Sequence, residues 1–138
     1  MAIFGIGAYY DEDVSAQFIQ HSIAGPGWDE LKAPELFQYV ASLKVGDIVY
    51  IKSCPPSSKD IHIKGIGFVA DHKLLTDTKD TNHLVSAGRR INWINTEKFT
   101  IPKPQEKNNV RLNTMYEEFH PEVQKIIMGK VISAVKNT

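Results

Sequence analysis

The chain has 138 residues, no formal net charge at neutral pH and a single cysteine. This length suits one domain, residues 1–138, and a neutral charge counts against non-specific binding to nucleic acid, which an excess of Lys and Arg carries. Cys54 alone cannot form an intramolecular disulfide, there is no apolar run of about 20 residues, and the N-terminus lacks a basic start. We therefore expect a cytoplasmic domain with no membrane partner and no signal peptide.

The N-terminal third predicts one strand and two helices. Residues 2–9 have the apolar and small residues of a strand, and Asp11–Asp13 would begin a helix whose face runs from Val14 to Ile23. The stretch Ala24–Gly27 stops that helix. Pro34 suits the start of a second short helix, because proline lacks the N–H that a helix start leaves unpaired.

Two β-branched runs, Ile48–Ile51 and Ile61–Ala70, predict a long antiparallel hairpin. Gly65 and Gly67 lie within its second strand, where glycine indicates a bulge or a sharp bend. A bend of this kind allows a short sheet to curl. Lys52 and Ser53 follow directly where the first strand ends, at the rim of the expected barrel.

The C-terminal half predicts further short strands and a helical end. Residues 71–87 are polar and predict a long exposed loop, with room for a short strand at Leu84–Val85. Strands are expected at Arg89–Asn95, at 99–101 and, as an edge strand, at 108–112. The segment 113–138 is expected to be helical, with a turn at Met115–Phe119 and a final helix that begins at Pro121. The apolar face of this final helix consists of Val123, Ile126, Ile127, Val131 and Val135.

Hairpin-like links between these strands indicate an α+β fold: a small, curled, mostly antiparallel β-barrel flanked by helices, with a C-terminal helix. The sequence contains no recognisable set of catalytic residues. His62, His72 and His83 match no compact metal-ligand spacing, and Cys54 has no neighbouring base. The two Gly-Ile-Gly sequences are not phosphate-binding loops. We therefore predict no catalytic residue, no metal and no cofactor.

Aromatic and polar side chains near the strand ends give the candidate site. A ring together with a few hydrogen-bonding groups on a barrel rim is what recognition of a flipped or single-stranded base requires. The residues of this kind are Tyr10, Trp28, Lys52, Ser53, Arg89 and Arg90.

Five segments carry a family resemblance: IGAYYDED, GPGWDEL, LKVGDIVYIKS, IKGIGFVAD and GRRINWI, in this order over roughly residues 3–95. The sequence resembles an EVE-like domain of the PUA-like superfamily. Such domains occur alone and at the N-termini of modification-dependent restriction proteins. The resemblance implies a pocket at the barrel edge that binds a modified base, with Tyr10 and Trp28 as walls and Lys52 and Ser53 as hydrogen-bonding groups.

The expected function is therefore a non-enzymatic module that recognises a modified base in DNA or RNA. No motor or nuclease domain is expected here, so a separate effector protein is a possible partner. A protein-interaction domain of a defence-type system, associating through the apolar face of the last helix, is the alternative. An enzyme accessory or a hydrolase acting on a small ligand is a third reading, for which no acid–base or nucleophile constellation is found.

Overall fold

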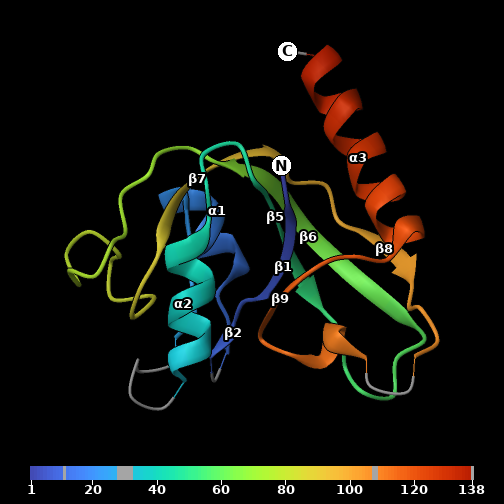
Figure 1. The fold of residues 1–138 in the computed structure, drawn as a ribbon, viewed down its shortest axis with the longest axis horizontal. Coiled ribbons are helices and arrows are strands. Elements are labelled where there is room, and N and C mark those ends of the chain that lie inside the picture. The colour runs from blue at the N-terminus through green and yellow to red at the C-terminus, as the bar shows by residue number, and fades with distance from the viewer. Residues whose placement is uncertain (11, 28–32, 107–108, 138) are drawn as a thin grey trace.

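The computed structural model describes residues 1–10, 12–27, 33–106 and 109–137 (Figure 1). The first half holds β1 (Ile3–Gly7), β2 (Tyr9–Tyr10), β3 (Glu12–Asp13), α1 (Ser15–His21), β4 (Ile23–Ala24) and α2 (Pro34–Ser42). The second half holds β5 (Ile48–Ser53), β6 (Asp60–Val69), β7 (Arg89–Asn95), β8 (Phe99–Pro102), a 3₁₀ turn (Val110–Leu112), β9 (Met115–Glu117) and α3 (Pro121–Lys136).

The strands form a curled, mixed sheet in the order β4-β7-β6-β5-β1-β9, with β8 on the first half of β6. The α+β class and the C-terminal helix are confirmed, and the sheet is a half-barrel whose edges are β4 and β9. The expectation that hairpin-like links join all the strands is wrong. Strands β1 and β5 pair in parallel, and a parallel pair needs a crossover, which here carries α1 and α2.

The β5–β6 hairpin is confirmed, and its bends lie near the glycines. The register shifts between Ile51 and Lys52 on β5 and between Ile66 and Gly67 on β6. The first half of β6 pairs with β8 and its second half with β7, so one long strand serves two neighbours. Such irregularities bend a sheet, and the first of them lies directly before Lys52, which pairs with Ile63.

The start of α1 differs from the prediction, and so does its end. Glu12 and Asp13 lie in β3, but the Asp13 carboxylate still accepts hydrogen bonds from the Ser15 amide and hydroxyl at 2.9 and 2.6 Å. The helix ends at Ser22, which has a positive φ of 56°. Ile23 therefore belongs to β4, paired with β7, and not to the helix.

The segment before α3 also corrects the prediction. Met115–Glu117 is a strand and not a helical turn, and 110–112 is a 3₁₀ turn and not an edge strand; Asn108 lies outside the described residues. Strand β9 pairs with β1 because Gly5 leaves room for the Tyr116 ring: a Cβ on Gly5 would lie 2.5 Å from that ring.

The loop after β6 is less open than expected. Within residues 71–88 there is a single-residue bridge between Leu75 and Gly88, and the strand predicted at Leu84–Val85 does not form. The side chains of Leu75, Val85 and Ala87 are buried. This loop therefore closes one end of the core instead of standing in solvent.

Helices cover the two faces of the sheet separately (Figure 1). Helices α1 and α2 pack on one face through Phe18, Leu36 and Val40. Helix α3 packs on the other through Val123, Ile127 and Val131, so most of its predicted apolar face is core, while Val135 is exposed. In the described part of the chain, no helix is long and apolar enough to cross a membrane.

Candidate ligand pocket

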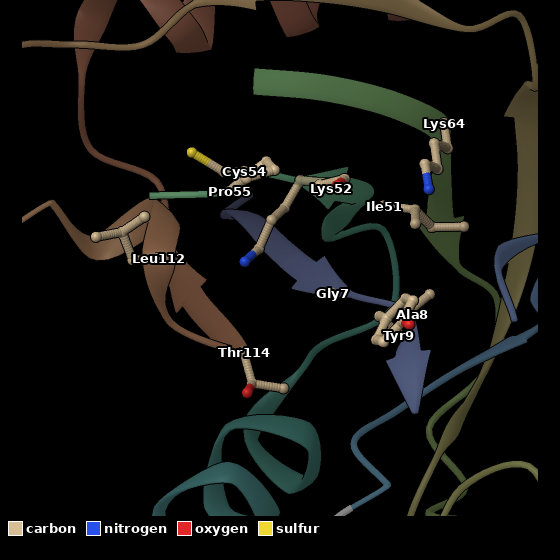
Figure 2. A pocket seen from close by; sticks show the side chains of 11 residues that line it. Gly7, Ala8, Tyr9, Ile51, Lys52, Cys54, Pro55, Lys64, Leu112 and Thr114 are labelled. Carbon is tan, nitrogen blue, oxygen red and sulfur yellow. The ribbon is translucent and has the colours of Figure 1, made fainter. Parts of the chain in front are cut away.

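A pocket of about 490 Å³ opens where β1 ends beside β5 (Figure 2). This size is typical of sites for small molecules or single groups of a larger ligand. Its walls come from the end of β1 and the turn after it, the end of β5 and the loop that follows, one residue of β6, and the segment before β9. The lining residues are Gly7, Ala8, Tyr9, Ile51, Lys52, Ser53, Cys54, Pro55, Lys64, Leu112 and Thr114.

Lys52 lies in the wall of this pocket with its side chain almost buried. It reaches from β5 toward the side where Leu112 and Thr114 lie (Figure 2). Its ammonium donates hydrogen bonds to the main-chain carbonyls of Arg111 and Asn113, at 2.9 and 2.6 Å. Burial lowers the pKa of Lys52 to about 8, because leaving water disfavours the charged form. Lys52 therefore connects the segment before β9 to the sheet, and it also places an ammonium group, a hydrogen-bond donor, at the pocket.

A second lysine marks the opposite side. Lys64 of β6 forms an ion pair of 2.6 Å with Asp13 of β3, so it fastens the small β2–β3 hairpin to the sheet. Partial burial raises the pKa of Asp13, but the hydrogen bonds from Lys64 and Ser15 outweigh it and lower that pKa to about 2. The Asp13 carboxylate is thus charged across the neutral range and holds Lys64 at the pocket.

One aromatic ring stands open beside these groups. Tyr9 is 72% exposed, at the start of β2, and lines the pocket together with the Gly7 and Ala8 backbone. Ser53 and Thr114 add hydroxyls, and Ile51 and Leu112 add aliphatic surface. The arrangement offers a flat ring, two hydroxyl groups and two cationic side chains.

The structure brings together two of the six predicted site residues, Lys52 and Ser53. Tyr10 lies in β2, next to the lining residue Tyr9, and Trp28 lies outside the described residues. Arg90 is half-buried on β7, beside Ile23 of β4, and does not line the pocket.

Arg89 lies on β7, and its side chain reaches the C-terminal end of α2 and not the pocket. Its guanidinium is buried and donates to the carbonyls of Val40, Leu43 and Asp71, at 3.1, 2.5 and 2.8 Å. Burial lowers the pKa of Arg89. Carbonyls at a helix end lack intrahelical partners, and Arg89 adds a donor there, although the Val40 carbonyl also accepts a hydrogen bond from the Leu43 amide. Arg89 is placed to hold α2 against the sheet and not to reach a ligand in the pocket.

Sequence reasoning missed Tyr9, Lys64, Leu112 and Thr114 and set Cys54 aside. The alternation of β6 places Lys64 on the face opposite Ile63, and this was the one available signal for it. Leu112 and Thr114 reach the pocket through pairing with β1, which is distant in sequence. In the described part of the chain, no side-chain hydrogen bond joins Cys54 or Ser53 to a histidine or a carboxylate, although the backbone of Ser53 pairs with that of His62 in the sheet. No group of three or more His, Cys, Asp or Glu in this part could hold a metal.

Comparison of the sequence with protein-family models finds no matching family, and comparison with curated proteins finds no matching relative.

Proposed function

We propose that this chain is a non-catalytic binding module of the EVE-like, PUA-like type, which takes a base of DNA or RNA into the pocket beside Lys52. The observation that carries the proposal is the meeting of Lys52, Ser53 and the exposed Tyr9 ring in one pocket. The sequence predicted Lys52 and Ser53 from their place at a strand end. Tyr9 lies next to Tyr10, which the sequence also predicted.

The chemistry of the lining suits a base better than a purely apolar ligand. A tyrosine face stacks on any base, and hydroxyl and ammonium groups read the base edge. Ser53 and Thr114 are the hydroxyl-bearing residues of the lining for that edge. Lys64 stands on the rim, where a phosphate next to the base would compete with Asp13 for its charge. Because the chain has no net charge, a single lysine contact to phosphate would add little affinity, and the pocket would supply both most of the affinity and the selectivity.

A binding experiment tests the proposal directly. Fluorescence anisotropy is measured with labelled single-stranded DNA and RNA oligonucleotides that carry unmodified or modified bases. We expect saturable binding of one modified base over its unmodified parent, and a loss of about tenfold for Tyr9→Ala, since stacking contributes roughly 1–3 kcal/mol per base. Trp28→Ala is tested beside it.

Tyr39→Ala is the matched control, because Tyr39 is also a partly exposed tyrosine, 38% accessible, but lies on α2 outside this pocket. Equal losses for Tyr9→Ala and Tyr39→Ala would place the ligand elsewhere. Absence of binding by the wild-type chain to every oligonucleotide would overturn the proposal as a whole.

A further inference from the structure

Helix α3 has an exposed stripe directly opposite the face that packs on the sheet. Its buried residues are Val123, Ile127 and Val131. At 3.6 residues per turn, the stripe on the other side is centred on Gly129. The stripe consists of Glu122, Lys125, Gly129, Ile132, Ser133 and Lys136, all exposed, and Ile132 is 50% exposed. In Figure 1 the C-terminal part of α3 extends past the sheet.

Gly129 has no explanation within the described part of the chain. Glycine is the poorest helix former after proline, and a general use of it is to let another group approach the backbone closely. Among the described residues, nothing outside the helix backbone lies within 4 Å of the place where a Cβ on Gly129 would stand. Alanine would fit there and would favour the helix. The glycine therefore leaves room on the outer surface for a contact that one copy of the chain does not make.

We propose that α3 pairs antiparallel with α3 of a second copy of this chain, with the two-fold axis at Gly129. In that arrangement, residues equally far from Gly129 in opposite directions face each other. Glu122 lies seven residues before Gly129 and Lys136 seven residues after it, so each Glu122 faces the partner's Lys136. Lys125 and Ser133 lie four residues to either side and meet in the same way, so no like charges are opposed.

The charge pattern selects the second copy and the orientation. A parallel pair would place Lys125 against Lys125 and Lys136 against Lys136, whereas the antiparallel pair makes two Glu–Lys contacts and opposes the helix dipoles favourably. Close approach at Gly129 allows Ile132 of each copy to pack over the partner's Gly129 and the aliphatic part of Lys125. The opposite apolar face of α3 is core, so this contact is not the one that the sequence pattern predicted.

Sedimentation equilibrium of the full chain, from about 10 µM to about 1 mM, tests the proposal, because a contact of one helix pair falls in the small, weak class of interfaces. We expect a monomer–dimer equilibrium for the wild-type chain. Gly129→Ala is the decisive variant. It should raise the melting temperature by a few degrees, because alanine favours the helix, and it should weaken dimerisation about tenfold or more, because the methyl group separates the helices.

Charge reversal provides the second, independent variant set. Glu122→Lys and Lys136→Glu should each weaken dimerisation, and the double variant should restore it. Glu35→Lys is the matched control, since Glu35 occupies the first turn of α2 as Glu122 occupies that of α3. A wild-type chain that stays monomeric throughout, a Gly129→Ala chain that dimerises as the wild type does, or a double variant without restoration would each overturn the proposal. Binding of oligonucleotides is independent of all three results.

Discussion

The ammonium of Lys52 donates a 2.6 Å hydrogen bond to the main-chain carbonyl of Asn113, from β5 to the segment that leads into β9. One side chain therefore holds two distant parts of the chain together and lines the candidate pocket at the same point. Its second bond, to the Arg111 carbonyl, fixes the 3₁₀ turn as well. An experiment on Lys52 must therefore distinguish its role in stability from its role in the pocket. The pH dependence of unfolding measures the first role alone.

The stability of the fold should rise between pH 8 and pH 9.5 through Lys52. Burial lowers its pKa from 10.5 to about 8, so in this interval the unfolded chain binds more protons than the folded chain, and the free energy of unfolding increases with pH. From pH 8 to pH 9.5 the gain is on the order of 1.5 kcal/mol. Urea unfolding at several pH values measures this gain. The range stays below pH 10 because burial raises the pKa of Tyr50 and of Tyr116 in the folded chain. Above about pH 10 these tyrosines would lose protons in the unfolded chain first, which would lower the stability.

Lys52→Met serves as the reference for this measurement, since it keeps an unbranched chain without a titrating group. The difference in unfolding free energy between wild type and Lys52→Met should grow in favour of the wild type as the pH rises. A constant difference would show that Lys52 has an ordinary pKa in the folded chain.

Replacement of Arg89 should reduce stability without affecting the pocket. Arg89→Lys retains the charge but loses the fork that reaches three carbonyls, and we expect a loss of about 2 kcal/mol in the free energy of unfolding. Arg90→Lys, at the adjacent half-buried position, should change it by less than about 0.5 kcal/mol. Oligonucleotide affinity measured well below the melting temperature should be unchanged in both. Lost affinity with intact stability in Arg89→Lys would assign Arg89 to the ligand site.

The parts of the fold that sequence predicts well are those that local pattern determines. The β5–β6 hairpin, α2 after Pro34 and α3 after Pro121 each follow from periodicity and a nearby turn or cap. Strand β9 does not, because it is three residues long and its partner, β1, lies more than a hundred residues earlier in the chain. The close fit of the Tyr116 ring over Gly5 is part of this pairing, and a local pattern does not show it.

The same division holds for the candidate site. Lys52 and Ser53 were accessible to prediction because a strand end marks a rim. Thr114 and Leu112 were not, since they reach the pocket through the β1–β9 pairing. Arg89 resembled a rim residue by its place at a strand start. Its direction, into the end of α2, depends on how the crossover packs, which a local pattern does not show.

The Asp13–Lys64 ion pair should hold the β2–β3 hairpin over the pocket edge. With Asp13→Asn we expect faster hydrogen exchange at the amides of the hairpin and a lower affinity for any ligand that contacts Tyr9. The pKa of Asp13 is lowered to about 2, so its contribution to stability is present above pH 4 and is lost as the pH falls through about 2. The contribution is modest, since the carboxylate is 45% exposed.

Hydrogen exchange followed by mass spectrometry at pH 7, compared with Glu12→Gln, checks this prediction. Glu12 is an exposed acidic neighbour on the same strand, so it matches the charge change without the ion pair. Equal exchange in the two variants would mean that Lys64 does not restrain the hairpin.

A buried polar network beneath β9 should be the most sensitive part of the fold. The Glu118 carboxylate is fully buried and accepts hydrogen bonds from the Tyr50 hydroxyl at 2.9 Å and from Nε of Arg111 at 3.0 Å, and its second oxygen pairs with Nη2 of Arg111. Burial opposes the charge of Arg111, but Glu118 and Glu106 outweigh it and raise the Arg111 pKa. Removing the carboxylate charge would leave that guanidinium without its buried counter-ion.

Glu118→Gln should therefore lower the free energy of unfolding by about 3–5 kcal/mol, as expected when one partner of a buried pair is lost. Tyr50→Phe removes a single hydroxyl and should cost about 1–2 kcal/mol. The adjacent Glu117→Gln, half-buried on β9, is the control and should change stability by less than about 0.5 kcal/mol. Because the Tyr50 hydroxyl donates to the Glu118 carboxylate, the double variant Tyr50→Phe/Glu118→Gln should cost less than the two single losses combined. Strict additivity in urea unfolding would show that this hydroxyl and the carboxylate do not contribute to stability through each other.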